Sequence, residues 1–402
     1  MKQRKEYNGY QAFSWLEPGV DYKDIKLAAD VARVPPYVVP VNEAEELEVQ
    51  RILDEEIIVS AHEHASKIPE NVDEIFEYRR GGREFTGYAG LAQSGLDIFF
   101  ENFMDGTALI TSPNGWKWYD VIHDLGTHLA DIDHQDMIYL ARTLDDLYRA
   151  KPSGKIAMVG VLEAATACEN EVDRVDVLYG FGIRVMGITY SESNALGSGL
   201  KEPNDGGLTT FGRQVVRRMN RIGMTIDVSH CGVKTAVDVI EASEKPVFAT
   251  HCGARALWDI NRLLPDYALK ALGEHDGVIG IEAAPHTTLT HAHPLHSIDS
   301  IMEHFEYVAD LIGIDHVTFG PDTLFGDHVG LHHAFAAQLS ISAASKHGPD
   351  FEEVPYVKGM ENPGENFPNI IRWLVSHGYT RDEIRKVVGR NTLRILEATW
   401  AR

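Results

Sequence analysis

Residues 207–230 read GLTTFGRQVVRRMNRIGMTIDVSH, a helical pattern followed directly by a strand pattern. Apolar residues recur at helical spacing over residues 210–223 and predict an amphipathic helix. These apolar positions are Phe211, Val215, Met219 and Ile222. A short apolar run then predicts a buried strand over residues 224–230, which ends on His230. A helix that leads into a buried strand is typical of βα units around a parallel sheet.

The same alternation occurs along most of the chain. Eight short apolar runs rich in Val and Ile predict strands, and helical patterns lie between them. The predicted strands are residues 57–62, 96–103, 156–163, 184–190, 224–230, 247–251, 278–282 and 316–322. The predicted helices are residues 133–150, 169–179, 210–223, 233–243, 266–274 and 298–312, with a last helix starting near Thr380. This order predicts an α/β protein with a (β/α)8 TIM barrel fold.

Some segments lie outside the regular alternation. Residues 1–50 are predicted to form an N-terminal extension packed on the barrel, and residues 51–402 the barrel itself. The segments 105–131 and 323–368 are predicted to be long loops after strands two and eight, the second with at most short helices. Both leave the carboxyl ends of strands, where barrel enzymes carry their substrate loops.

Composition limits the classes of partner and compartment. The formal net charge of −23 argues against nucleic acid and anionic membrane surfaces as partners. Three cysteines are too few for a disulfide framework, and no secretory signal or apolar stretch of membrane-spanning length is visible. The expected setting is therefore the reducing cytoplasm.

Polar residues with metal-binding side chains follow five of the predicted strands. They are His62, His64, Glu163, His230, His251 and Asp322. In an extended chain His62 and His64 point to the same side, whereas Glu63 points away. One such residue alone is more often a hydrogen-bonded structural residue or a helix cap. Their joint occurrence at the catalytic end of one barrel predicts a metal site.

The ligand types indicate which metal ions fit. Imidazole and carboxylate suit Zn²⁺ first, with Mn²⁺, Fe²⁺ or Co²⁺ as alternatives. Four histidines and a glutamate exceed the needs of one open catalytic ion and suit two ions that share a carboxylate and a bridging hydroxide. Cys231 and Cys252 each follow a candidate ligand and are interpreted as packing residues. His328, His332 and His333 are expected to be solvated loop residues.

Several motifs resemble those of the membrane dipeptidase (renal dipeptidase, peptidase M19) family of the amidohydrolase superfamily. They are ITYSESNALGSG at 188–199, the stretch 207–230, PVFATHCGARAL at 246–257, DGVIGIEAAP at 276–285, FGPD at 319–322 and VVGRNTLRIL at 387–396. The resemblance extends from about Glu55 to the C-terminus and is weak in the two long insertions.

The resemblance implies two divalent ions, usually zinc, and the family's site residues. One ion would bind His62, residue 64 and Glu163, while the other would share Glu163 and bind His230 and His251. Asp322 matches the aspartate that orients the hydroxide and moves its proton. Arg262 matches the arginine that binds the substrate's free carboxylate. Members often form pairs, so the resemblance implies a homodimer or a higher homo-oligomer.

Two positions depart from the family pattern. Most members have Asp where this chain has His64, so the site loses one negative charge. Many members have a substrate-binding His where this chain has Tyr190, whose phenol can still donate to an oxyanion.

The predicted function is hydrolysis of the amide bond in a dipeptide or a similar small N-acyl amino acid. Asp322 would accept a proton from the bridging water and pass it to the leaving amine. Tyr190 would stabilise the oxyanion, and Arg262 would position the substrate. The first alternative keeps this site but changes the substrate to a lactone, a cyclic amide or another non-peptide. A non-catalytic binding protein built on the same barrel is the second.

Overall fold

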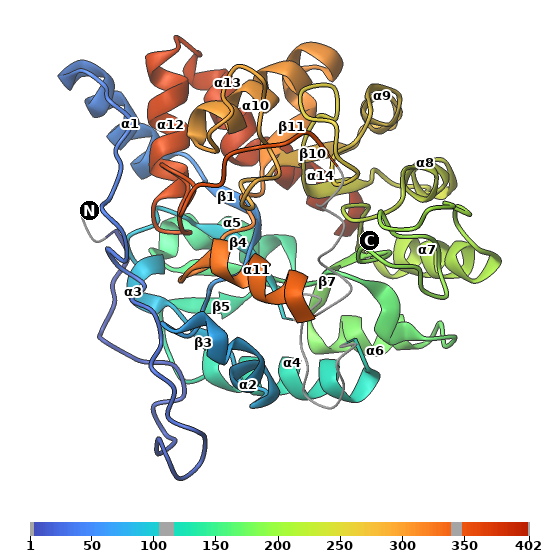
Figure 1. Ribbon diagram of the computed structural model, residues 1–402, viewed down its shortest axis with the longest axis horizontal. Helices are drawn as coiled ribbons and strands as arrows, with labels where there is room; N and C mark the ends of the chain where they lie inside the picture. Colours follow the sequence, from blue (N-terminus) through green and yellow to red (C-terminus); the bar gives the residue numbers. More distant parts are fainter. Residues whose placement is uncertain (1–3, 104–115, 339–347, 401–402) are drawn as a thin grey trace.

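The computed structural model describes residues 4–103, 116–338 and 348–400 (Figure 1). Eight parallel strands form one sheet in the order β1-β4-β6-β7-β8-β9-β10-β11. Their bounds are β1 Val59–Glu63, β4 Ile98–Asn102, β6 Ile156–Leu162, β7 Ile183–Gly187, β8 Thr225–Asp227, β9 Phe248–Cys252, β10 Val278–Ile281 and β11 Val317–Phe319. Each of the eight predicted barrel strands corresponds to one of them.

The first and last barrel strands meet at their carboxyl ends. The Asp322 backbone N–H donates to the His62 carbonyl at 3.1 Å, and the His64 N–H donates to the Thr323 carbonyl at 2.9 Å. Phe100 of β4 and Phe248 of β9 lie on opposite sides of the barrel, and their ring centroids are 6.0 Å apart. The barrel therefore closes around a packed interior, as expected for a (β/α)8 fold.

Helices alternate with these strands and surround them in Figure 1. They are α5 Leu144–Ser153, α6 Arg174–Phe181, α7 Thr210–Ile222, α8 Val233–Ala242, α9 Asp266–Glu274, α10 Ile298–Ile312 and α12 Asn366–Ser376. The last part of the chain forms α13 Arg381–Arg385, a π-helical turn Lys386–Arg390 and α14 Asn391–Trp400. Thr380 caps α13 through a capping box with Glu383, as its spacing predicts.

Smaller elements complete the described chain. Helical ones are α1 Glu43–Glu55, α2 Ile75–Arg80, α3 Tyr88–Leu91, α4 Trp118–Ile132, α11 His328–Gln338 and the short turns Val72–Glu74, Ala165–Cys168 and Ile314–His316. Extended ones are the antiparallel pair β2 Ser66–Lys67 and β3 Phe85–Thr86, and β5 Ile138–Leu140, which pairs with β6. In the described part of the chain, no helix combines the length and apolarity needed to cross a bilayer.

The structure corrects the prediction of one helix over residues 133–150. The apolar residues of β5 instead pair with β6, and a new helix begins after Thr143, which caps α5. Helix α4 also occupies most of the predicted loop 105–131, of which residues 105–115 lie outside the described chain. Its buried Val121, Leu125 and Ile132 follow a helical spacing.

The segment after β11 also contains more helix than expected. Helix α11 begins at His328 and lies in front of the barrel strands in Figure 1 (orange). His328 is buried, so the prediction of a solvated loop histidine is wrong for that residue, whereas the His333 side chain is 57% exposed. The carboxyl end of the barrel is therefore partly covered by this segment.

The N-terminal segment packs against the rest of the chain. Tyr10 Oη and the Phe13 N–H both donate to Asp131 of α4, and Arg372 of α12 forms an ion pair with Glu46 of α1. Helix α1 spans residue 50, the predicted boundary of the extension. The division at that residue stays a prediction.

Candidate metal centre

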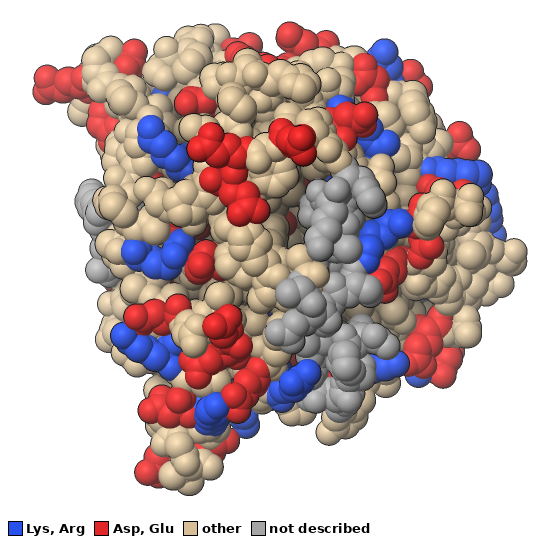
Figure 2. Space-filling model, in the orientation of Figure 1, with Lys and Arg blue, Asp and Glu red and all other residues tan. Residues whose placement is uncertain are grey.

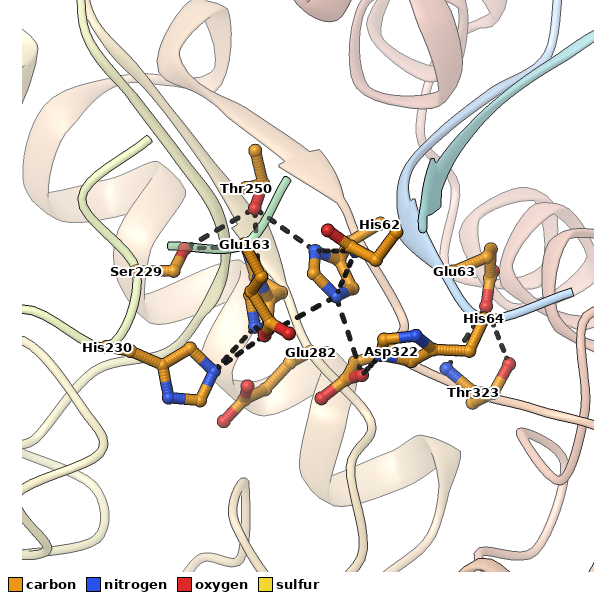
Figure 3. A network of polar contacts seen from close by, with 12 residues as sticks. His62, Glu63, His64, Glu163, Ser229, His230, Thr250, Glu282, Asp322 and Thr323 are labelled. Atoms are coloured by element: carbon orange, nitrogen blue, oxygen red, sulfur yellow. Dashed lines mark hydrogen bonds and ion pairs between the residues drawn. The ribbon is translucent and has the colours of Figure 1, made fainter. Parts of the chain in front are cut away.

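The strand ends bring the six predicted metal-centre residues into one cluster (Figure 3). His62 lies in β1 and His251 in β9, whereas Glu163, His230 and Asp322 follow β6, β8 and β11. The sixth residue, His64, comes directly after β1. All six side chains are buried or nearly buried, the most exposed being Asp322 at 13%.

One carboxylate oxygen of Glu163 is at the centre of the first group. Glu163 Oε1 lies 3.0 Å from His230 Nε2, 3.2 Å from His251 Nε2 and 3.9 Å from His62 Nε2. The Nε2 atoms of His230 and His251 are themselves 2.9 Å apart. Glu163 therefore faces histidines from three different strands.

Asp322 organises the second group. Its Oδ1 lies 3.0 Å from His64 Nε2 and 3.6 Å from His62 Nε2. His62 thus approaches both carboxylates and connects the two groups. Glu63 points away from them, as predicted, and accepts hydrogen bonds from Thr323 and Ser60.

Local backbone geometry places two of these side chains. Residues His230 and Asp322 have φ angles of 60° and 57°, in the left-handed region that non-glycine residues seldom adopt. Such a conformation costs about 1–3 kcal/mol and persists only where the surroundings impose it. At Gly187 in β7, a Cβ atom would lie 1.9 Å from the Glu163 carbonyl oxygen. Only glycine therefore allows β7 to pass this close to Glu163.

The histidines are held in the neutral form that binds metal ions. Burial lowers the pKa values of His62, His230 and His251 well below the usual value. Burial by itself would raise the pKa of Asp322, but the hydrogen bond with His64 holds it well below the usual value. The cluster therefore combines uncharged imidazoles with an ionised carboxylate.

Thr250 fixes which nitrogen of His251 faces the centre. Its Oγ1 donates to Asp227 Oδ2 at 2.6 Å and lies 2.9 Å from His251 Nδ1. Since the single hydroxyl proton goes to Asp227, Oγ1 accepts the Nδ1 proton of His251. The lone pair on His251 Nε2 then points to Glu163, the arrangement that metal-binding histidines have.

The donor set fits two metal ions better than it fits a hydrogen-bonded core. Neutral His230 and His251 direct nitrogens at one another and at a carboxylate oxygen, and such converging acceptors favour a cation between them. Among the described residues, two groups that could hold an ion are His62–His64–Asp322 and Glu163–His230–His251. Two further groups overlap with these: His62–Asp227–His251 and His251–Glu282–Asp322.

Residues 123–338 match the family model of the membrane dipeptidases, peptidase family M19. The match covers more than half of the 402 residues. The chain belongs to this family. This confirms the resemblance that the motifs indicate.

Relatives in fungi share this part of the chain. Dipeptidase tcpJ of Claviceps purpurea is 29% identical over 65% of this chain and 56% of its own length. Dipeptidase aclJ of Aspergillus oryzae is 27% identical over 69% of this chain and 59% of its own length. This M19 chain thus spans less than two thirds of these two relatives.

Solved structures confirm the barrel. An amidohydrolase from Pseudomonas aeruginosa is 25% identical with a TM-score of 0.71, covering 88% of this chain and 99% of that one. A metallo peptidase from Rhodobacter sphaeroides, liganded with a phosphinate mimic of the dipeptide L-Ala-D-Ala, has a TM-score of 0.66 at 19% identity, covering 86% and 100%. At that identity the second structure supports the fold of this M19 chain alone.

The two predicted substrate-binding residues of this M19 chain lie beside the cluster. The Tyr190 ring stacks on the His230 imidazole with centroids 4.2 Å apart. Arg262 is buried, donates to the His251 carbonyl at 2.9 Å through Nη2, and forms an ion pair with Glu282. The structure thus brings both residues to the site but gives Arg262 a partner that the motifs did not predict.

Four polar residues around the cluster were missed by sequence reasoning. They are Asn102, Asp227, Thr250 and Glu282. Glu282 follows β10 and belongs to one potential ligand group with His251 and Asp322. Its position at the end of a predicted strand was a usable signal, since the other ligands were found in that way. Asn102 ends β4, and its Nδ2 lies 2.8 Å from His62 Nε2.

Burial changes the acidity of the missed carboxyl groups. It raises the pKa of Glu282 to about 7 against the opposing charge of Arg262. It also raises the pKa of Asp227, although the hydrogen bonds from Thr250 and Ser229 oppose this. A bound cation would lower both values, because it favours the ionised form.

Proposed function

We propose that this chain hydrolyses the amide bond of a dipeptide or a dipeptide-like N-acyl amino acid at a centre of two divalent ions. The observation that carries the proposal is the convergence of three imidazoles on Glu163 Oε1, at 3.0, 3.2 and 3.9 Å. Membership of the M19 family and the fungal relatives named dipeptidases support the substrate class.

The ligands of the two ions are proposed from the family resemblance, since the first group in the structure holds Asp322 in place of Glu163. His62, His64 and Glu163 would hold one ion, whereas Glu163, His230 and His251 would hold the other. Zinc is the first candidate because imidazole and carboxylate ligands without thiolate suit it. When bound, the two ions would polarise the scissile carbonyl and would lower the pKa of water, so that hydroxide is available as nucleophile at neutral pH.

Asp322 is the residue proposed to move the proton. Its low pKa keeps it ionised, so it can accept a proton from the attacking water. Its Oδ1 is held by the hydrogen bond with His64 at 3.0 Å, which fixes its orientation at the edge of the cluster. The same group would return the proton to the leaving amine.

Tyr190 and Arg262 are proposed to contact the substrate. The Tyr190 hydroxyl would donate to the carbonyl oxygen as negative charge develops there, and stacking on His230 holds the ring beside the cluster. Arg262 would bind the far end of the substrate and set its position relative to the ions.

The setting of the enzyme stays a prediction. All three cysteines of the sequence, Cys168, Cys231 and Cys252, are buried and free. Free thiols agree with a reducing compartment such as the cytoplasm. A homodimer or higher homo-oligomer is proposed from the family resemblance.

The proposal is tested with a panel of dipeptides, dipeptide amides and N-acyl amino acids before and after chelation. The metal content of each sample is measured by plasma mass spectrometry. We expect cleavage that disappears with the metal and returns when Zn²⁺ or Mn²⁺ is added. A fully metal-loaded protein that cleaves no member of the panel would contradict the proposed activity.

A further inference from the structure

By the family resemblance, Arg262 corresponds to an arginine that binds the carboxylate of the substrate. In this structure Arg262 instead forms an ion pair with Glu282. Both members of the Arg262–Glu282 pair are buried, with exposed fractions of 8% and 0%. Arg262 Nη2 forms the ion pair with Glu282 and also donates a hydrogen bond to the His251 carbonyl at 2.9 Å. One terminal nitrogen of the guanidinium is therefore fully used inside the protein.

The other terminal nitrogen remains available. Arg262 Nη1 is buried and has no hydrogen-bond partner among the residues that the structure describes. A buried donor without a partner costs about 1–3 kcal/mol, so a ligand oxygen that reached Nη1 would be stabilised. A carboxylate bound by both terminal nitrogens would need to displace Glu282.

Glu282 lies close to two of the residues of the proposed site. Ligand atoms of Glu282, His251 and Asp322 all lie within 4.8 Å of one another. In Figure 3 the Glu282 carboxylate is drawn between His230 and Asp322. A substrate carboxylate at Arg262 would therefore lie beside the carboxylates of Glu282 and Asp322.

We propose that Glu282 determines specificity by neutralising Arg262 and excluding substrates with a free carboxylate at that position. The preferred substrate is then a dipeptide-like amide whose carboxyl end is blocked as an amide, as an ester or in a ring. Its neutral carbonyl oxygen accepts one hydrogen bond from Arg262 Nη1 without displacing Glu282. This inference rests on the proposed function, because it assigns the substrate class of the same hydrolytic site.

The test compares the metal-loaded enzyme on a dipeptide and on the same dipeptide with an amidated carboxyl end. We expect kcat/KM for the amidated compound to exceed that for the free acid by about tenfold or more, because like charges are avoided. Glu282→Gln keeps the shape of the side chain and removes its charge. In this variant the preference should shift toward the free acid by about tenfold, mainly through a lower KM.

A matched control removes a different buried carboxylate. Glu361 pairs with Arg33 and lines a small pocket with His328. Glu361→Gln should leave the ratio between the two substrates unchanged. Preference of the wild-type enzyme for the free acid would overturn the inference, as would an unchanged ratio in Glu282→Gln. Loss of metal from Glu282→Gln would also overturn it, by making Glu282 a metal ligand.

A binding measurement separates this inference from the proposed function. Calorimetric titration of both compounds into the metal-loaded protein should show tighter binding of the amidated one, whether or not either is cleaved. Absence of chelator-sensitive cleavage with that binding preference contradicts the proposed function alone. Cleavage of both compounds with tighter binding of the free acid contradicts the inference alone.

Discussion

The metal side of the site contains the histidines, Glu163 and Asp322, whereas the substrate side contains Arg262 and Glu282. The two sides differ in their balance of charge. On the metal side, buried neutral imidazoles and the carboxylates of Glu163 and Asp322 converge on one another. On the substrate side, the charge of Arg262 is already balanced by Glu282. The first arrangement requires added positive charge, whereas the second is complete without a ligand of opposite charge.

This difference shows where ligands of each kind are expected. Converging acceptors in a buried site favour cations, so the metal side should lose its organisation when ions are removed. The ion pair on the substrate side should persist, because Arg262 and Glu282 balance each other's charge. The face seen in Figure 2 is of mixed charge, since acidic side chains occur in several groups, with lysines and arginines between them.

The largest effect is expected from Glu163→Gln on the metal side. The amide cannot share an anionic oxygen between two ions, so both should bind more weakly and kcat/KM should fall by about four orders of magnitude or more. Metal content by plasma mass spectrometry and steady-state kinetics measure the two effects. Glu274→Gln, at the exposed end of α9, is the matched control and should behave as wild type. Retention of both ions and of activity in Glu163→Gln would show that the two ions do not depend on a shared Glu163 carboxylate.

Asp322→Asn should separate proton transfer from metal binding. The amide cannot accept the proton, so kcat should fall by about three orders of magnitude. The ions should stay bound, since the proposed ligand sets leave Asp322 out. Kinetics and metal analysis of the same sample test this. Full activity with both ions present would contradict the role of Asp322, and loss of one ion would make Asp322 a ligand.

Tyr190→Phe tests the proposed hydrogen bond from the Tyr190 hydroxyl to the carbonyl oxygen of the substrate. Loss of one donor to the developing oxyanion should lower kcat by about 10²-fold. The ring still stacks on His230, so metal content should not change. A kcat equal to that of the wild type would show that the phenol makes no contact in the transition state.

Thr250→Val should give the smallest change, because Thr250 acts through the proposed ligands His251 and His62 and is not itself a proposed ligand. Without the hydroxyl, the tautomer of His251 is no longer fixed, and metal affinity should fall by about 10–100-fold. Competition with a chelator of known affinity measures the change, while activity at saturating metal should stay close to that of the wild type. Thr250→Ser keeps the hydroxyl and is the control. Equal affinities of the valine and serine variants would contradict the argument.

The sequence predicts the metal side far better than the substrate side. Proposed ligands such as His62 and His230 come at or shortly after the ends of apolar strands, and the parallel arrangement brings all strand ends to one rim. The sequence also predicts regular helices well, since the predicted helices 266–274 and 298–312 coincide with α9 and α10. These features depend on the local sequence pattern and on the rule that the parallel strands of a barrel all end at the same rim.

Features that depend on contacts between distant segments were missed. The pairing of Arg262 with Glu282 joins a loop after β9 to the end of β10, and the sequence pattern of either residue does not reveal the other. Strand β5 was assigned to a helix because its apolar residues fit both periods. Helix α11 was expected to be loop because of the glycines around it, although its first residues pack over the site.

Anomalous scattering from a crystal of gently purified protein tests the central claim most directly. Data collected above and below the absorption edge of the bound metal would locate each ion. The account predicts two peaks on either side of Glu163, one beside His62 and His64 and the other beside His230 and His251. No peak at Glu163, or a single ion held by Glu282 and Asp322, would contradict it.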